Sequence, residues 1–194
     1  MKKKLTVKDI LESKGKKKLT QVYVHSPLEA NACEQSGIDM IVSSENNNFK
    51  FLRESAMNTF FTVGLQFGRY LSEYEIVKRS FQLLESGADA IYCPQSSRFI
   101  KAIANEGIPV VGHAGFIPYK ATHYGGFKAY GKNLNEAKKI LKQIHTLQEA
   151  GAFTTEIEIV PEEIIEILYK KTDIFLIGMG SGNICDAQYL FSED

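Results

Sequence analysis

The sequence predicts an α/β protein, and within that class a TIM-type (β/α) barrel. Short apolar segments alternate with amphipathic segments along the chain, which is typical of parallel strands joined by helical crossovers. Most amphipathic segments end on a glycine directly before the next apolar segment, as at Gly37, Gly87, Gly107 and Gly151. The apolar segments are nearly continuous, and no GxGxxG segment follows the first of them. The pattern therefore favours a closed barrel over an open dinucleotide-binding sheet.

The first elements follow from short local signals. Apolar residues at Val7, Ile10 and Leu11 predict a helix over 6–13 with Thr6 as its N-cap. The next elements are, in order, a strand over 19–25, a helix over 28–36, a strand over 38–44, a poorly patterned segment over 45–58 and a strand over 59–65.

The second half carries clearer helix signals. Ser72 and Glu75 form a capping box at the start of a helix over 72–86, and Asn133 suits the N-cap of a long helix over 133–150. The remaining elements are strands over 88–94, 108–113, 152–160 and 173–178, and helices over 97–106, from Pro161 onward and over 186–191.

These elements give seven recognisable strands, whereas a complete barrel of this type has eight. The chain has 194 residues, against about 250 in a typical barrel. We expect one barrel domain over residues 1–194. Its eighth strand is missing, comes from elsewhere or lies within 45–58.

The bulk composition excludes several classes of protein. Basic and acidic residues balance at 23 each, so no net charge favours nucleic acid or an anionic membrane. The three widely spaced cysteines argue against a disulfide framework or a structural zinc site. No apolar run approaches the roughly 18 residues of a membrane span, and the N-terminus lacks the apolar core of a signal peptide. We expect a soluble, cytoplasmic protein.

The strand ends supply the candidate functional residues, because functional side chains of a parallel barrel lie at the carboxyl ends of its strands. A histidine, a glutamate, several hydroxyl groups and a glycine-rich loop would meet at one mouth, which suits acid–base chemistry on a small polar substrate. These ends are 25–26, 43–45, 64–66, 92–93, His113, Glu158 and 178–183.

Two of these side chains are the strongest candidates. In the alternating segment 154–159, Glu156 and Glu158 share one face of the strand. Either both carboxylates face water on an edge strand, or Glu158 points into the mouth of the barrel as a general base. His113 is either a core histidine or a site residue whose glycine neighbours leave room for a ligand.

The glycine-rich loop over 178–183, GMGSGN, lies between a strand and the last predicted helix. Its backbone N–H groups can cradle a carboxylate or phosphate, although a tight turn also requires glycines. The sequence contains no metal-ligand spacing, nucleophile elbow or P-loop.

Three segments carry a resemblance to a known family. They read VVGHAGFIPYKATHYGGFKAYGK, AGAFTTEIEIVPEEI and FLIGMGSGNICDAQYL. In this order they resemble the GH-x-G-x-x-P, GG-[FY]-K-x-x-G, E-x-V-P and IG-x-G-x-N segments of ketopantoate hydroxymethyltransferase, a member of the phosphoenolpyruvate mutase/isocitrate lyase superfamily. The resemblance covers most of the chain and is most specific over 108–190.

The resemblance implies roles for individual residues. It makes Glu158 the base that takes the C3 proton of 2-oxoisovalerate, and His113 a contact of the 2-oxo acid. The further substrate-binding residues expected on this basis are Ser43, Ser44, Tyr92, Lys128, Gly180 and Asn183.

The sequence departs from the family where the family binds magnesium. The family holds the metal on an aspartate after strand two and another after strand three, and residues 43–45 and 63–65 read SSE and VGL there. Tyr92 replaces a substrate-binding lysine, and Pro94 replaces an acidic residue. We therefore expect no metal site and no Mg²⁺, with Glu45 as the single weak candidate ligand.

Loss of the metal affects the chemistry, because enolising a 2-oxo acid requires positive charge near the developing enolate oxygen. Either His113, Lys120 or Lys128 supplies that charge, or the chemistry has changed, or there is none.

Two functions from different classes remain open at this point. The first is a ketopantoate hydroxymethyltransferase-like enzyme of pantothenate biosynthesis, acting on a small 2-oxo acid with methylenetetrahydrofolate as carbon donor. The alternative is a catalytically degenerate relative that binds a small carboxylate or serves as a structural partner. The resemblance also implies a homo-oligomer and a C-terminus shorter than that of the family.

Overall fold

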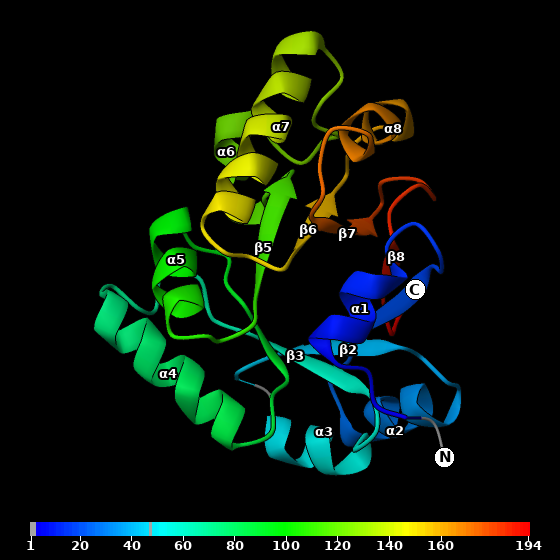
Figure 1. Ribbon diagram of the computed structural model, residues 1–194, viewed down its shortest axis with the longest axis vertical. Helices are drawn as coiled ribbons and strands as arrows, with labels where there is room; N and C mark the ends of the chain where they lie inside the picture. The colour runs from blue at the N-terminus through cyan, green and yellow to red at the C-terminus, as the bar shows by residue number, and fades with distance from the viewer. Residues whose placement is uncertain (1–2, 47) are drawn as a thin grey trace.

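Eight parallel strands form a closed barrel in the computed structural model, which describes residues 3–46 and 48–194 (Figure 1). The strands follow one another around the barrel in chain order, and β8 closes it against β1. The predicted (β/α) barrel is therefore confirmed. The strands are β1 (Leu19–Tyr23), β2 (Met40–Ser44), β3 (Phe60–Gly64), β4 (Ala90–Tyr92), β5 (Val110–Gly115), β6 (Thr154–Glu158), β7 (Phe175–Met179) and β8 (Ala187–Phe191).

The eighth strand lies where the sequence predicts a helix. β8 pairs along its whole length with β1 and at its start with β7. Its inward side chains Ala187 and Tyr189 are buried, whereas Leu190 on the outer face is exposed. The predicted helix over 186–191 is therefore wrong. A short apolar run fits either periodicity, and pairing with the two flanking strands decides the outcome here.

Helices surround the barrel and connect most of its strands (Figure 1). Segment 45–58 contains the helix α3 rather than a strand, and the connection after β5 holds two short helices that the sequence does not predict. Residues 180–186, all of them described, join β7 to β8 without a helix. The helices are α1 (Val7–Ser13), α2 (Pro27–Gln35), α3 (Phe49–Ser55), α4 (Glu73–Glu85), α5 (Ser97–Asn105), the 3₁₀ helix η1 (Pro118–Lys120), α6 (Ala121–Tyr124), α7 (Leu134–Glu149) and α8 (Glu162–Tyr169).

The predicted helix starts have the expected caps. The Thr6 side chain accepts a hydrogen bond from the Asp9 backbone N–H, which completes a capping box at α1. Ser72 and Glu75 form the same reciprocal arrangement at α4. Such caps satisfy backbone N–H groups that lack a partner in the first turn, and each contributes about 1 kcal/mol.

The core has two parts, one inside the barrel and one between the strands and the helices. Inward residues such as Met40 and Phe175 belong to the inner cluster, and the outward residues Ile41 and Leu176 belong to the outer one. Ile10 of α1 is completely buried within the inner cluster. Helix α1 therefore closes the N-terminal end of the barrel and leaves the carboxyl ends of the strands for a site.

Asp186, at the start of β8, ties that closed end together. Its carboxylate accepts hydrogen bonds from the Leu176 backbone N–H (2.9 Å) and from the Tyr169 hydroxyl (2.5 Å). The Lys14 ammonium, at the end of α1, lies 3.0 Å from the same carboxylate. Asp186 is only 3% exposed, so one buried charge joins α1, β7, α8 and the beginning of β8.

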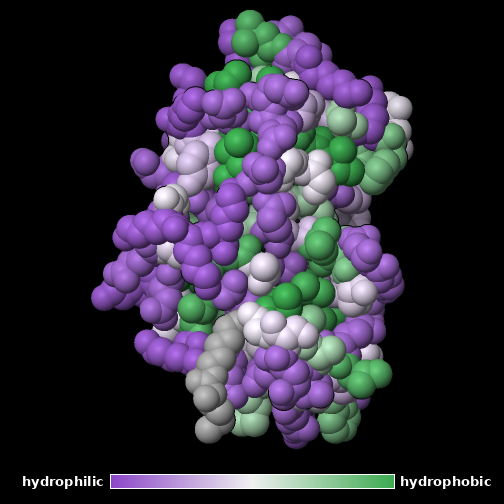
Figure 2. Space-filling model, turned by 90° about the vertical axis from the view of Figure 1, so that its right-hand side faces the viewer, coloured by the Kyte–Doolittle hydropathy of each residue, from purple (hydrophilic) through white to green (hydrophobic). Residues whose placement is uncertain are grey.

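The outer surface is mixed in polarity. Figure 2 shows the side that carries α1 and α2, where small apolar areas are scattered among hydrophilic side chains. No helix within the described ranges is long and apolar enough to cross a membrane.

Candidate active site

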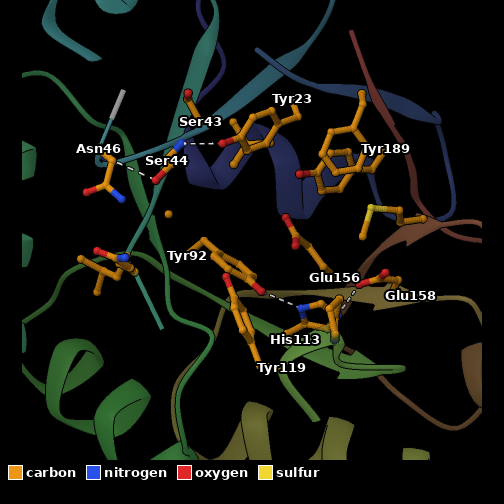
Figure 3. A pocket seen from close by; sticks show the side chains of 17 residues that line it. Tyr23, Ser43, Ser44, Asn46, Tyr92, His113, Tyr119, Glu156, Glu158 and Tyr189 are labelled. Atoms are coloured by element: carbon orange, nitrogen blue, oxygen red, sulfur yellow. Dashed lines mark hydrogen bonds and ion pairs between the residues drawn. The ribbon is translucent and has the colours of Figure 1, made fainter. Parts of the chain in front are cut away.

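A cavity of about 450 Å³ opens at the carboxyl ends of the strands (Figure 3). Every strand of the barrel contributes to its wall, as expected for a site at this end of a parallel barrel. Its lining residues are Tyr23, Val42, Ser43, Ser44, Asn46, Gly64, Leu65, Gln66, Tyr92, His113, Pro118, Tyr119, Glu156, Glu158, Met179, Tyr189 and Phe191.

Strands β5 and β6 place a histidine and two glutamates side by side. In their parallel register His113 lies opposite Glu156, and Gly115 lies opposite Glu158. All three polar side chains are buried, with exposed fractions of 8% for His113, 3% for Glu156 and 6% for Glu158. The edge-strand alternative for the two carboxylates is therefore wrong, because β6 is flanked by β5 and β7 in a closed barrel.

The glycines around His113 let β5 approach its neighbours. Gly115 has a φ of 83°, and a Cβ there would lie 2.6 Å from the Glu158 backbone oxygen. A Cβ at Gly112 would lie 3.0 Å from the Leu147 side chain on α7. Beyond Gly115, the Phe116 backbone N–H donates to the Glu158 carbonyl oxygen at 2.9 Å. The glycine-rich segment thus fixes the backbone on which both His113 and Glu158 stand.

His113 has a partner at each ring nitrogen. Nδ1 lies 2.6 Å from the Tyr92 hydroxyl, and Nε2 lies 3.1 Å from the Phe116 carbonyl oxygen. A carbonyl oxygen only accepts, so we place the proton on Nε2, and neutral His113 then accepts from Tyr92 through Nδ1. Burial raises the pKa of Tyr92 well above its ordinary value, so this phenol keeps the proton that it donates.

Glu158 faces the cavity with one oxygen left free. Its Oε2 lies 3.1 Å from His113 Nε2, but the hydrogen bond from that nitrogen goes to the Phe116 carbonyl. Oε2 accepts no hydrogen bond from the described part of the chain. The next residue, Ile159, has a φ of 48°, which is rare for a β-branched residue and marks a strained turn directly after the carboxylate.

Glu156 is a second inward carboxylate, which the sequence patterns do not single out as a site residue. Its Oε1 accepts a hydrogen bond from Gln21 Nε2 on β1 at 3.1 Å. Burial raises the pKa of Glu156 to about 7, and the nearby Glu158 carboxylate adds to the rise, while His113 and Gln21 oppose it. The sequence does indicate its position, because alternation along the strand puts Glu156 on the same face as Glu158.

Three further tyrosines line the cavity and were also not selected from the sequence. Tyr23 accepts a hydrogen bond from the Ser44 backbone N–H at 3.2 Å. Tyr189 comes from β8, which was assigned to a helix, so its inward direction could not be foreseen. Tyr119 lies on η1 and stacks on Phe67, with ring centroids 4.4 Å apart. The cavity is thus rich in phenols.

The predicted substrate-binding residues divide into two groups. Ser44 and Tyr92 lie on the cavity wall, as does Ser43, although the Ser43 hydroxyl donates to the Val24 carbonyl oxygen at 2.6 Å. Lys128, Gly180 and Asn183 are exposed and do not line the cavity.

Met179 lines the cavity, but residues 180–183 of the glycine-rich loop lie away from it because they lead directly to β8. The Asn183 backbone N–H donates to the Glu162 carboxylate at 3.0 Å, and its carbonyl accepts from Lys18. A Cβ at Gly182 would lie 2.6 Å from the Glu162 side chain. The glycines here allow close packing against α8, so the loop directs the Asn183 N–H to a protein carboxylate.

The residues present do not fit a divalent metal ion at the place where the resemblance puts magnesium. The Glu45 carboxylate accepts hydrogen bonds from the Gln66 backbone N–H (2.9 Å), the Tyr70 hydroxyl (2.6 Å) and Arg79 Nε (2.7 Å). It does not line the cavity. The nearby wall offers Ser44 and Gly64 instead of the carboxylates that Mg²⁺ prefers. Within residues 3–46 and 48–194, no three histidine, cysteine or acidic side chains form a group that could hold a metal.

Comparison with known proteins shows the family. The sequence model described as ketopantoate hydroxymethyltransferase matches residues 46–194. The 3-methyl-2-oxobutanoate hydroxymethyltransferase of Kosmotoga olearia is 30% identical, over 98% of this chain and 80% of that protein. The enzyme of the same name from Thermosipho africanus is 31% identical, over 98% of this chain and 81% of that protein.

Solved structures show the same fold at low sequence identity. A 2,3-dimethylmalate lyase, described as a PEP mutase/isocitrate lyase superfamily member, superposes with a TM-score of 0.68 at 11% identity, covering 96% of this chain and 81% of that one. A phosphonopyruvate hydrolase superposes with a TM-score of 0.62 at 14% identity, covering 90% of this chain and 72% of that one. These similarities concern the fold alone.

Proposed function

Because the chain belongs to the ketopantoate hydroxymethyltransferase family, we propose that it transfers a one-carbon unit to the 2-oxo acid 2-oxoisovalerate through an enolate. One observation carries this proposal. The buried Glu158 carboxylate lines the cavity, and its Oε2 accepts no hydrogen bond from the described residues. A carboxylate oxygen without a donor is available to accept a substrate proton.

In the first step, Glu158 removes the proton from C3 of the bound 2-oxo acid. The electron pair of the C3–H bond forms the C2=C3 double bond, and the carbonyl π electrons move onto oxygen. In the second step, water hydrolyses methylenetetrahydrofolate: both bonds from the methylene carbon to the folate nitrogens break, the two protons of water go to those nitrogens, and its oxygen stays on the carbon as formaldehyde. The enolate then reforms its C=O bond as C3 bonds to that carbon, and the resulting alkoxide takes up the proton held by Glu158. The products are a hydroxymethylated 2-oxo acid and tetrahydrofolate.

His113 acts on Glu158 and on the cavity wall in this scheme. Its Nε2 lies 3.1 Å from Glu158 Oε2, so the imidazole stands beside the oxygen that takes up the substrate proton. Its Nδ1 holds the Tyr92 hydroxyl at 2.6 Å, which fixes the ring of Tyr92 against the substrate space. Tyr92 stands where the resemblance places a lysine, so a neutral phenol contacts the 2-oxo acid instead of a cation.

The carbon donor has a suitable place beside the cavity. A second hollow of about 410 Å³ shares a wall with it, since Phe67 lines the hollow and stacks on Tyr119 of the cavity. Phe99 and Leu71 add apolar surface there, and Arg98 and Lys120 add positive charge. A flat pterin ring and an acidic tail would suit these contacts.

The first half-reaction tests the proposal without the donor. Wild-type protein is incubated with 2-oxoisovalerate in heavy water, with Mg²⁺ in one arm and EDTA in another, and exchange at C3 is followed by NMR. We expect exchange in the wild type and a loss of 10²–10⁴-fold in Glu158→Gln, because the amide cannot accept the proton. Glu166→Gln is the matched control, since Glu166 is exposed and its ion pair among the described residues is with Lys170.

Absence of exchange by the wild type in both arms would overturn the proposed reaction and leave the degenerate, carboxylate-binding alternative. Equal exchange by Glu158→Gln and the wild type would remove Glu158 as the base.

A further inference from the structure

Glu156 is a buried carboxyl group that the steps above do not use. It points from β6 into the cavity two residues before Glu158, between Tyr189 and His113 (Figure 3). Its Oε1 is held by Gln21 Nε2 at 3.1 Å, whereas its Oε2 has no partner among the described side chains. One oxygen is therefore fixed by the protein and the other is available to a ligand.

The charge of the cavity restricts the state of Glu156. Of the described residues that line the cavity, none is a lysine or an arginine, and the acidic ones are Glu156 and Glu158. The 2-oxo acid brings its own carboxylate, and enolisation places a second negative charge on the carbonyl oxygen. If Glu156 were also ionised, three negative charges would share this space both before and after Glu158 takes the proton, and they would repel one another strongly. Glu158 must be ionised to act as a base, so Glu156 is the group that has to be neutral.

We propose that Glu156, as a neutral carboxylic acid, donates a hydrogen bond from Oε2 to the 2-oxo oxygen of the substrate and to the enolate oxygen formed there. This inference rests on the proposed function. It makes Glu156 a further catalytic residue, which supplies the electrophilic assistance for which this cavity has no metal-binding carboxylate set.

The geometry of β6 suits one glutamate acting as the base and the other as the hydrogen-bond donor. Residues two apart on a strand point to the same face and are separated by about 6.6 Å along it. The C3–C2–O unit of the substrate fits between two such groups, with C3 toward Glu158 and the oxygen toward Glu156. During enolisation Glu158 gains the C3 proton, the electron pair moves to the carbonyl oxygen, and Glu156 keeps its own proton throughout.

The surroundings of Glu156 favour its neutral form. Besides Gln21 of β1, it faces the phenols of Tyr92 on β4 and Tyr189 on β8, His113 on β5 and the carboxylate of Glu158 on its own strand. Only His113 can carry positive charge in this set, and its hydrogen bonds are those of the neutral ring. Burial and Glu158 accordingly raise the pKa of Glu156, to about 7.

The variant Glu156→Gln tests whether Glu156 acts as a hydrogen-bond donor or as a negative charge, because an amide can donate but is not charged. In Glu156→Gln the amide oxygen can still accept from Gln21 while the amide N–H points to the substrate, as in the protonated acid. We expect C3 exchange within about tenfold of the wild type, and loss of the wild-type decline in kcat at alkaline pD. Glu156→Leu removes the donor, and we expect kcat to fall by 10²–10³-fold with a smaller change in KM.

Tyr189→Phe is the matched control, since the Tyr189 hydroxyl is the neighbouring donor that competes for the same role. The proposal is overturned if Glu156→Leu exchanges as fast as the wild type, if Tyr189→Phe alone causes the loss, or if Glu156→Gln keeps the alkaline decline. A thermal melt of each variant by circular dichroism establishes that it is folded.

A binding measurement separates this inference from the proposed function. Affinity for 2-oxoisovalerate is measured by titration calorimetry from pH 6 to 9, in buffers of different ionisation enthalpy. We expect wild-type binding to weaken with rising pH and to take up a proton, and Glu156→Gln binding to do neither. Wild-type binding without proton uptake would overturn the role of Glu156 even if exchange occurs. Absence of C3 exchange together with proton-coupled binding would overturn the reaction and leave the neutral Glu156 in place.

Discussion

At the scale of single residues, burial and contacts decide what chemically similar side chains do. Glu45, Glu156 and Glu158 are all buried glutamates near the carboxyl ends of strands. Glu45 accepts three hydrogen bonds, one of them from Arg79, and is a structural anion. Glu156 accepts one from a neutral amide, and Glu158 Oε2 accepts none among the described residues. The number and charge of the donors thus separate the structural carboxylate from the two that face the cavity.

The raised pKa of Glu156 makes folding stability depend on pH. Its folded value of about 7 lies above the ordinary 4.5, so the folded state holds a proton that the unfolded chain has lost in this range. Stability therefore decreases as pH rises from about 4.5 to about 7. We expect the wild type to lose about 2 kcal/mol relative to Glu156→Gln between pH 5.5 and pH 8. The free energy of unfolding of both proteins is measured in urea at the two pH values. If the difference between the two proteins is the same at both pH values, the prediction is wrong.

At the scale of elements, the close approach of β5 to β6 aligns His113 with the two glutamates. That approach depends on Gly115, where a Cβ would lie 2.6 Å from a backbone oxygen of β6. Parallel strands keep their spacing through backbone hydrogen bonds, so a side chain at this point would have to push the strands apart. The alignment of His113 with the two glutamates thus depends on a glycine at the end of β5.

Gly115→Ala should both destabilise the protein and impair the site. The positive φ costs about 1–2 kcal/mol for alanine, and the contact with the β6 backbone adds about 1–3 kcal/mol. Gly107→Ala is the matched control, because Gly107 also has a positive φ, 74°, but a Cβ there would meet nothing within 4 Å. Urea unfolding and C3 exchange are measured for both variants. Equal unfolding free energies would show that the contact with β6 is unimportant.

At the scale of the whole molecule, closure of the barrel depends on β8 and on the buried charge that precedes it. Asp186 connects α1, β7 and α8 through Lys14, Leu176 and Tyr169. Burial, and then the hydrogen bond to Asp186, raise the pKa of the Tyr169 phenol to about 12. The network lies at the end of the barrel opposite the cavity, so its effect on the site passes through the position of β8 and of Tyr189.

Asp186→Ala should destabilise the whole fold, because it leaves the buried Leu176 N–H without its acceptor and the half-buried Lys14 ammonium without its counter-charge. Breaking a buried charged network of this kind costs about 3–5 kcal/mol. Glu166→Gln removes only an exposed pair with Lys170 and should change stability by less than about 1 kcal/mol. Urea unfolding compares them. A change for Asp186→Ala as small as that of Glu166→Gln would mean that the network does not hold the barrel closed.

Much of this protein could be predicted from local sequence patterns. Helix caps such as Thr6 and Ser72, glycine stops such as Gly87, and short apolar strands predicted the order of seven strands and six of the helices. The family motifs then placed Glu158 and His113 on neighbouring strands at one end of the barrel. These features depend on residues close together in the chain, whose conformational preferences act before any long-range contact forms.

Contacts between distant segments decided the rest. β8 is a strand because its backbone pairs with β1, 168 residues earlier in the chain (Leu19 with Ala187), and no local signal records that pairing. Barrel closure then turned Tyr189 inward, buried Glu156 beside His113 and led residues 180–183 away from the cavity. Periodicity tells which side chains share a face, but only closure of the sheet tells which face is inside. The sequence by itself thus determined the elements and indicated Glu158 as the candidate base, and the tertiary structure determined the position of the second carboxyl group and the charge of the cavity around it.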